Sequence, residues 1–500
     1  MPSAASSLKC WMKTNKVILA LLLILALASF FRIYGLGTES LWLDEAHSVR
    51  VSGQNFVSVI RGAAVGKHTP LYFIGLHFWI GFLGDSEVSL RALSAIFGIL
   101  SVLIIYWVGC ALFNRKVGLI SSLLSAISLF HIHYSQEARP YSLLLLLSLL
   151  SFLFFIKILK QDKKWHYPCY LLCNILLCYT HVFGLFTFAA QIFFLLLFWS
   201  KYQSQRFKLL AVLGATIAAL LPLILFMGSE GISMAQHGSW IQEPSLTSIW
   251  STIRAFCGSR GLLVLFFFCL AVIAPFSIRK VEGTWILKKP VESLRSISWN
   301  IKPEAVEEFI LLAIWLFLPI VLLFVVSKII TPLYVTRYLI GASPALYLLV
   351  ARGLSELNIR KVIYPILIII VIVSSSGLVN YYTKINKEQW REVAELVQVN
   401  STKNDALFFC ANYVQNPFDY YYRGELAKFG IDRNVEDAQE IAAFVNDAIT
   451  GKKRLWLILS HTGRNPPIPV ESYLIDRYGN DSLLLEQEFV GVRVLVFAVK

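Results

Sequence analysis

Long apolar runs, separated by short charged segments, recur over the first 380 residues. The first run, Val17 to Phe31, can continue to Tyr34 and so reach the ~20 residues that a transmembrane helix needs. The pattern predicts eleven spans, at 17–34, 88–112, 117–134, 141–159, 167–181, 183–199, 207–228, 261–278, 308–327, 338–351 and 361–380. We therefore expect a polytopic α-helical membrane protein.

The first run also has features of a signal sequence. Lys9, Lys13 and Lys16 precede it, and Ala26-Leu27-Ala28 resembles a cleavage site. Cleavage would remove the first span. We favour its retention, because the polar stretch that follows is better explained as a loop tethered at both ends.

Lysine and arginine are unevenly distributed over the loops. With a cytoplasmic N-terminus, the inner segments hold 21 of these residues, against 10 in the outer segments before residue 381. The positive-inside rule favours this orientation. The apolar stretch from Pro70 to Gly84 is short, and a crossing there would invert every later loop. We expect it to lie at the membrane interface, with Tyr72 and Trp79 as anchors.

The pattern changes after residue 380. Helical periodicity at 387–400 and 435–449 alternates with strand-like runs, at 406–410, 455–459, 482–489 and 492–499. Such alternation is typical of a small α/β domain. We thus expect a transmembrane domain at 1–380, with an outer loop at 35–87, and an α/β domain at 381–500. Eleven spans from a cytoplasmic N-terminus place this second domain on the extracytoplasmic side.

Composition supports the membrane assignment and excludes other classes. Of the residues, 57% are hydrophobic and 15% are charged, against about 25% charged in an average soluble domain. The net charge of +14 would suit nucleic acid if basic and aromatic residues formed one face. Here the basic residues lie between apolar runs, so no nucleic-acid partner is expected. The eight cysteines have no paired CxxC spacing of the zinc or redox type.

A charged motif directly follows the first span. It reads Leu41-Trp42-Leu43-Asp44-Glu45-Ala46-His47-Ser48-Val49-Arg50. Charge near hydrocarbon is costly unless it faces water, a partner or a ligand, so adjacent carboxylates there suggest a site. A loop that simply faces solvent explains the motif about equally well when it is taken alone.

Other unusual residues also gather on the expected outer side. They are His68, His131, His133, Tyr134, Gln136, Glu137, Arg139, Tyr141, His181, Tyr334, Arg337 and Tyr338. The inner loops carry mostly lysine and arginine, so the asymmetry points to chemistry on the outer face. Arg139 could instead pair with Glu137 or Glu45, and Arg337 could be an interfacial anchor. His131 and His133 would not share a helix face, which favours packing roles over a shared metal site.

The order of these motifs resembles a known family. The motifs are Trp42-x-Asp44-Glu45-Ala46-x-Ser48, Lys67-His68-Thr69-Pro70-Leu71-Tyr72, the stretch 91–95, the stretch 134–143 and Arg337-Tyr338-Leu339. Over roughly residues 15–380, the chain resembles bacterial membrane glycosyltransferases of the GT-C superfold. It is similar to the protein O-mannosyltransferase and lipid A aminoarabinose transferase group, glycosyltransferase family 39. The resemblance implies transfer of a sugar, with inversion, from a polyprenyl-phosphate carrier to an extracytoplasmic protein, lipid or glycan, in contact with membrane lipids.

The resemblance also implies roles for single residues. Asp44 would be the general base, and Glu45 would orient the acceptor, support Asp44 or help to hold a metal. The expected ligands of the donor phosphate are Lys67, His68, Arg139 and Arg337, since a guanidinium donates two parallel hydrogen bonds. Further candidates for substrate binding are His47, Arg50, Tyr72, Tyr134, Glu137, Tyr141, Tyr334 and Tyr338. Relatives often have a double proline or an acidic residue where this chain has Lys67-His68-Thr69-Pro70. A divalent metal is therefore possible but not indicated, and no cofactor is certain.

The residues fit this chemistry, with two alternatives. A glycosidase needs two opposed carboxyl groups to protonate its leaving group, whereas a lipid phosphate leaves as a stable anion, so one base and several cations can suffice. The first alternative is a transporter or flippase of lipid-linked sugars, which would need polar residues in both leaflets. The second is a receptor whose outer domain binds a partner.

Overall fold

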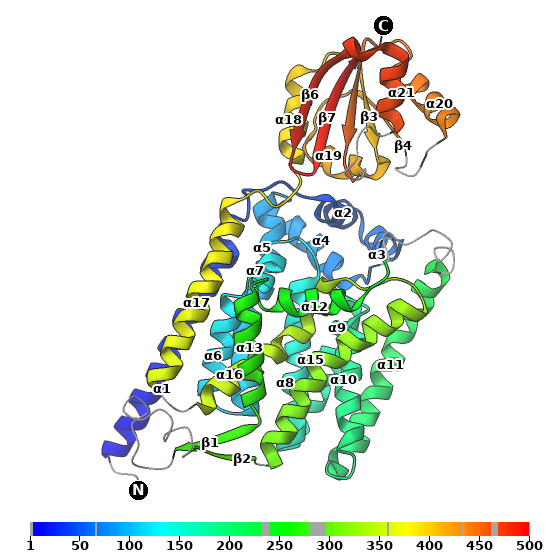
Figure 1. The fold of residues 1–500 in the computed structure, drawn as a ribbon. Helices are drawn as coiled ribbons and strands as arrows, with labels where there is room; N and C mark the ends of the chain where they lie inside the picture. The colour runs from blue at the N-terminus through cyan, green and yellow to red at the C-terminus, as the bar shows by residue number, and fades with distance from the viewer. Residues whose placement is uncertain are drawn as a thin grey trace. The chain divides into compact units, whose positions relative to one another are not determined.

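The computed structural model describes residues 4–65, 68–231, 241–280, 297–301, 303–357, 360–431, 435, 437–461 and 469–499. The chain divides into two compact units (Figure 1). The helical unit comprises Met1–Tyr34, Asn55–Phe82 and Leu90–Asn380. The α/β unit comprises Gly35–Gln54, Leu83–Ser89 and Tyr381–Lys500. The expected outer loop at 35–87 is thus shared between the two units.

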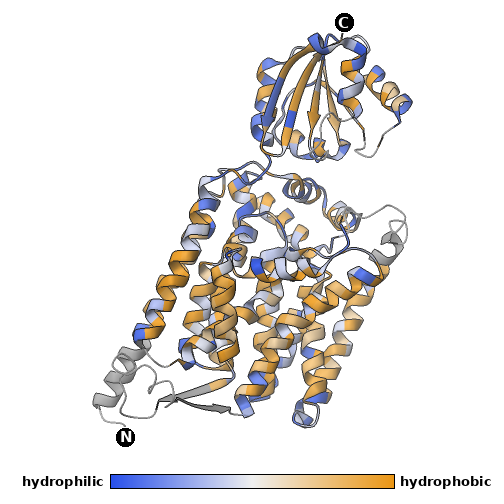
Figure 2. Ribbon diagram, in the orientation of Figure 1, coloured by the Kyte–Doolittle hydropathy of each residue, from blue (hydrophilic) through white to orange (hydrophobic). Residues whose placement is uncertain are grey.

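The helical unit is built almost entirely from helices. They are α1 (Ala4–Ile33), α3 (Phe56–Val65), α4 (Leu71–Leu83), α5 (Glu87–Leu112), α6 (Arg115–Ala126), α7 (Leu129–Ser135), α8 (Tyr141–Gln161), α9 (His166–Thr180), α10 (Gly184–Leu197), α11 (Gln203–Gly231), α12 (Leu246–Phe256), α13 (Gly261–Ile273), α15 (Pro303–Ile329), the 3₁₀ helix η2 (Thr336–Ala342), α16 (Ser343–Glu356) and α17 (Arg360–Thr383). Two short strands, β1 (Phe276–Lys280) and β2 (Ile297–Ile301), pair antiparallel. Hydrophobic residues cover most of the length of these helices (Figure 2).

Fewer helices are long and apolar enough to span a membrane than the eleven expected, although each expected segment contains helix. Among the described residues, seven helices are long and apolar enough to cross a membrane, or nine if each of two bent pairs is one span. The helices α9 and α10 have only 15 and 14 residues. The expected span at 117–134 is broken, because the Ser128 side chain accepts a hydrogen bond from the His131 amide and starts a new helix. The axes of α6 and α7 differ by 61°. The chain is an integral multi-pass membrane protein.

Small residues let neighbouring helices approach closely. A Cβ atom on Gly109 of α5 would lie 2.7 Å from the Cα atom of Gly118 on α6. A Cβ atom on Gly353 of α16 would collide with the carbonyl oxygen of Leu270 on α13. Glycine at these crossings permits the dispersion contacts that drive helix association in lipid.

Arg32 joins α1 to α6. Its side chain is completely buried and donates hydrogen bonds to the carbonyls of Ala126, at 3.2 Å, and Ser125, at 3.0 Å. These carbonyls belong to the C-terminal turn of α6, where the helix dipole favours a positive charge. A charged residue at the end of the first span is therefore part of the helix packing.

The α/β unit contains a five-stranded mixed sheet. Its strands are β3 (Asp405–Cys410), β4 (Ala427–Ile431), β5 (Arg454–Leu459), β6 (Leu483–Phe489) and β7 (Val492–Ala498), in the order β4-β3-β5-β7-β6. The strands β4, β3 and β5 are parallel, and β7 pairs antiparallel with β5 and β6. The four strands expected from the sequence are confirmed, while β4 is additional.

Helices cover both faces of this sheet (Figure 1). One face packs against α20 (Ala438–Ile449) and α21 (Pro469–Tyr478), and the other against α18 (Trp390–Asn400) and α19 (Gln415–Tyr421). Every residue of β3 is buried because both faces are covered. The unit also holds α2 (Leu43–Ser52), which packs against α19. The two helices expected at 387–400 and 435–449 are confirmed as α18 and α20, while α19 and α21 are additional.

Candidate active site

The acidic motif forms the first turn of α2. Trp42 is the extended N-cap residue, so Asp44 and Glu45 lie where the helix dipole favours negative charge. Successive residues of a helix point in different directions. Glu45 is completely buried, whereas Asp44 is half-buried and shares its side of the helix with His47, three residues later. Arg50 is exposed. The two carboxylates thus face different surroundings.

Glu45 forms a buried ion pair with Lys387. The Glu45 Oε2 and Lys387 Nζ atoms are 3.0 Å apart, and the Lys387 side chain is only 6% exposed. A metal at Glu45 would compete with this ammonium group, so the pair favours the supporting role among those expected for Glu45. Over the described residues, no group of three or more His, Cys, Asp or Glu side chains is arranged to hold a metal ion.

Residues far along the chain also hold the start of α2. The Leu43 amide donates to Glu388 Oε2 at 3.3 Å, and the Leu41 amide donates to the Tyr421 hydroxyl at 2.7 Å. Amide groups at a helix start have no intrahelical acceptor, so such partners replace water there. Sequence reasoning missed Lys387, Glu388 and Tyr421. The charged stretch 387–392, which follows the last span, was the available signal for Lys387 and Glu388. A charged stretch by itself does not indicate which residues it contacts.

A cluster of arginine and tyrosine side chains lies in the helical unit. We call Arg139, Tyr141, His181, Arg337 and Tyr338 the arginine–tyrosine cluster. The guanidinium carbons of Arg139 and Arg337 lie 5.9 Å and 5.8 Å from the centroid of the buried Tyr141 ring. The centroids of the His181 and Tyr338 rings are 5.0 Å apart. The positive charges of Arg139 and Arg337 both act on the His181 ring. Two guanidinium groups that share one ring create a positive potential that an anion would relieve.

His68 adjoins this cluster. Its Nε2 atom lies 3.4 Å from Arg139 Nη2. Three of the four residues expected to bind the donor phosphate, His68, Arg139 and Arg337, are therefore brought together from segments far apart in the sequence. The fourth, Lys67, lies outside the described residues.

The other predicted side chains of the helical unit are mostly engaged within the protein. The Tyr72 hydroxyl is 2.8 Å from Ser94 Oγ, which in turn donates to the Arg139 carbonyl at 3.1 Å. The Tyr334 hydroxyl is 2.9 Å from Thr252 Oγ1. The Tyr134 ring meets that of Tyr141 edge-on, at 5.2 Å. Tyr72 thus supports the backbone of a cluster residue.

The two histidines of α7 point to different partners, as expected. His131 is buried between Ser125 Oγ, 3.0 Å from its Nδ1 atom, and Ser343 Oγ, 2.7 Å from its Nε2 atom. His133 instead pairs with Glu137 at 3.2 Å. His131 therefore has the packing role that its spacing favoured, and Glu137, just after the end of α7, pairs with a side chain of that helix.

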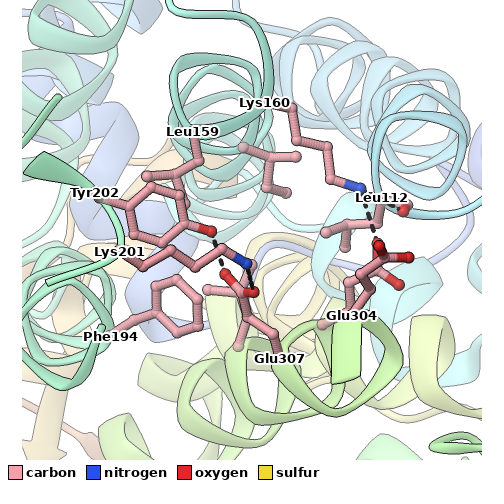
Figure 3. A pocket seen from close by; sticks show the side chains of 11 residues that line it. Leu112, Leu159, Lys160, Phe194, Lys201, Tyr202, Glu304 and Glu307 are labelled. Atoms are coloured by element: carbon pink, nitrogen blue, oxygen red, sulfur yellow. Dashed lines mark hydrogen bonds and ion pairs between the residues drawn. The ribbon is translucent and has the colours of Figure 1, made fainter. Parts of the chain in front are cut away.

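A polar pocket lies near α8, α10 and α15. Its cavity of about 280 Å³ is lined by Lys160, Lys201, Tyr202, Glu304, Glu307 and Glu308 together with apolar side chains. Lys201 and Tyr202 both point at Glu307 (Figure 3), and Lys160 pairs with Glu308 at 2.8 Å. The lining carries two ammonium groups and three carboxylates, which does not suit an anionic donor.

One family model matches part of the chain. Residues 67–226 match the family described as dolichyl-phosphate-mannose-protein mannosyltransferase. This segment includes His68, Arg139 and Tyr141. No curated protein sequence matches the chain.

Solved structures match almost the whole chain. The apo crystal structure of ArnT from Cupriavidus metallidurans has a TM-score of 0.60 at 12% identity, covering 97% of this chain and 98% of ArnT. ArnT bound to undecaprenyl phosphate has a TM-score of 0.57 at 11% identity, with coverages of 97% and 99%. The oligosaccharyltransferase AglB from Archaeoglobus fulgidus, with an inhibitory peptide and a dolichol-phosphate, has a TM-score of 0.53 at 12% identity, with coverages of 89% and 70%. At these identities the likeness shows the fold alone, and it confirms the GT-C fold expected from the sequence.

Proposed function

We propose that this chain, which has the GT-C fold, is a membrane glycosyltransferase. It moves a sugar from a polyprenyl-phosphate carrier to an extracytoplasmic acceptor hydroxyl or phosphate, with inversion. The observation that carries the proposal is the convergence of His68, Arg139 and Arg337 on one small region of the helical unit. A structure of similar fold holds undecaprenyl phosphate and another holds a dolichol-phosphate, which supports a lipid phosphate as the donor group.

The arginine–tyrosine cluster binds the carrier phosphate in this proposal. Guanidinium groups match phosphate oxygens with paired, charge-assisted hydrogen bonds. The leaving group gains negative charge as the bond to the sugar breaks, so fixed cations stabilise the transition state more than the ground state. Because Arg139 is only 2% exposed, water weakens these interactions less than it would at the surface.

Asp44 is the proposed general base. A half-buried carboxylate can take the proton from an acceptor hydroxyl as the oxygen attacks the anomeric carbon. The lipid phosphate needs no proton to leave, so a second catalytic acid is not required. A single catalytic carboxylate agrees with the ion pair between Glu45 and Lys387. Glu45 then acts through the position of α2 and not on the substrate.

An apolar groove supports a lipid-linked donor. A cavity of about 590 Å³ lies between α12, α13, α15 and α16, and its walls include Val264, Phe268, Phe317 and Leu346. Almost no polar surface lines it. Part of an isoprenoid chain can occupy such a groove without a specific polar contact.

The test is transfer of radiolabelled sugar by purified protein from a panel of polyprenyl-phosphate sugars, with native membrane extract as acceptor. We expect label in a product with wild type and none with Asp44→Asn, while both bind undecaprenyl phosphate equally. Arg254→Gln is a matched control, because Arg254 is an exposed residue of α12. Absence of product with every donor, despite saturable binding of the lipid phosphate, would contradict the proposal and favour a transporter. Normal turnover by Asp44→Asn would remove Asp44 as the base.

A further inference from the structure

The C-terminal residues of the chain hold the helix that carries the acidic motif. Glu45 on α2 and Lys387, which precedes α18, are 342 positions apart in the sequence, yet their charged atoms are 3.0 Å apart. We propose that Lys387 is a positioning residue of the transferase, which fixes α2, and with it Asp44, by neutralising Glu45. This inference rests on the proposed function, since it assumes that Asp44 is the base.

Burial makes the pair necessary for the position of α2. The Glu45 side chain is 0% exposed and that of Lys387 is 6% exposed. A carboxylate removed from water is costly unless a cation and hydrogen bonds compensate it. Without Lys387, the buried charge is relieved when Glu45 takes up a proton or when a movement of α2 returns Glu45 to water, and either response breaks the contact that fixes α2. Because residues of a helix are about 100° apart around the axis, such a rotation also redirects Asp44.

Two further carboxylates, Glu388 and Glu392, act on the same short segment. Glu388 accepts hydrogen bonds from the Leu43 amide, at 3.3 Å, and from Trp390 Nε1, at 2.6 Å. Glu392 accepts from Ser40 Oγ at 3.0 Å. These carboxylates precede or belong to α18, whose Trp390 is completely buried in the core of the α/β unit. The core of the sheet thus provides a rigid anchor for the start of α2.

Tyr421 of α19 completes this anchor. Its hydroxyl receives the Leu41 amide hydrogen at 2.7 Å and donates to Glu87, which also pairs with Arg391. The contacts from 387–392 and from Tyr421 reach α2 from two different helices of the unit. The C-terminal residues therefore form part of the catalytic apparatus, in addition to any role in binding an acceptor.

The pair is tested by comparing Lys387→Met with Lys387→Met/Glu45→Gln in the full-length protein. Lys387→Met keeps the length of the side chain but removes the cation that lies 3.0 Å from the buried Glu45 carboxylate, so we expect kcat to fall about 100-fold through displacement of the base. The KM for the donor and the binding of undecaprenyl phosphate stay unchanged, because the residues proposed to bind phosphate lie in the helical unit. The double variant has neither of the two charges, and we expect its kcat to be at least about tenfold higher than that of Lys387→Met. Lys428→Met, which breaks the more exposed Lys428–Asp419 pair of the same unit, is the matched control and should keep the kcat of wild type.

The outcomes separate this inference from the proposed function. If wild type transfers no sugar, the proposed function fails. If wild type is active and Lys387→Met keeps its kcat, or the folded double variant is no better than the single one, the positioning role is wrong. If Lys387→Met does not fold, Glu45→Gln is compared with the double variant instead. Glu45→Gln removes the carboxylate that pairs with the buried Lys387 ammonium group. Recovery in the double variant then supports the inference, and no recovery overturns it.

Discussion

Substitution of Arg337 by glutamine removes one charge from the proposed phosphate site while keeping a polar side chain. The guanidinium carbons of Arg337 and Arg139 lie 5.8 Å and 5.9 Å from the centroid of the Tyr141 ring, and the proposed phosphate site uses both groups. A guanidinium group about 4 Å from one phosphate charge contributes about 4 kcal/mol at an effective dielectric constant of ~20. Desolvation of the two groups offsets part of this attraction. The loss of one partner from such a pair costs about 2–5 kcal/mol in binding.

We therefore expect a loss of about 2 kcal/mol for Arg337→Gln, which corresponds to a Kd about 30-fold weaker. The assay is equilibrium binding of radiolabelled undecaprenyl phosphate to detergent-purified protein. The exposed Arg254 offers the matched control, and Arg254→Gln should bind as wild type does. A Kd for Arg337→Gln within about threefold of wild type would refute the reasoning, since one charge at this distance cannot be worth so little.

Two further predictions concern the core of the α/β unit and the apolar groove. Burial would raise the pKa of the Asp405 carboxyl, but hydrogen bonds from Arg454, Thr402 and Trp456 outweigh it and lower the pKa from its ordinary value of 3.8. Its stabilising effect is thus present above the unfolded pKa and is lost as pH falls through the lower folded pKa. We expect Asp405→Asn to destabilise the α/β unit by about 3 kcal/mol and to make its stability depend less on pH in the acidic range. Hydrogen exchange of the β3 and β5 amides measures this stability. Equal protection of these amides in wild type and Asp405→Asn would contradict the prediction. Ala313→Trp fills the groove between α13 and α15. It should therefore raise the KM for a long-chain polyprenyl donor but not for a short-chain analogue. An equal KM for both donors in this variant would show that the groove does not bind the lipid tail.

Local sequence patterns predicted most elements because those patterns are set by short-range physics. Apolar runs marked the membrane helices, since a hydrocarbon environment excludes charge over some 20 residues. Short strand-like runs marked β3, β5, β6 and β7. The strand β4 was missed because its five residues include a lysine and a glycine, which weaken the strand pattern. The break between α6 and α7 depends on the cap at Ser128, so the apolar pattern alone predicted one continuous span.

The candidate site divides in the same way. Sequence alone indicated which ionisable residues were unusual: Asp44, His68, Arg139 and Arg337 all stand at the ends of apolar runs, where charge needs a reason. It did not indicate that Tyr72 and Tyr334 direct their hydroxyl groups to Ser94 and Thr252, because either ring could equally have faced a substrate.

Only the tertiary structure decided which groups meet. Arg139 and Arg337 come together on Tyr141, and Lys387 reaches Glu45 across 342 positions. A long-range ion pair leaves no local pattern, because its stability depends on the burial of both charges and not on their neighbours in the chain. The sequence by itself therefore determined most of the helices and strands and the stock of reactive side chains, while packing determined which of them act together.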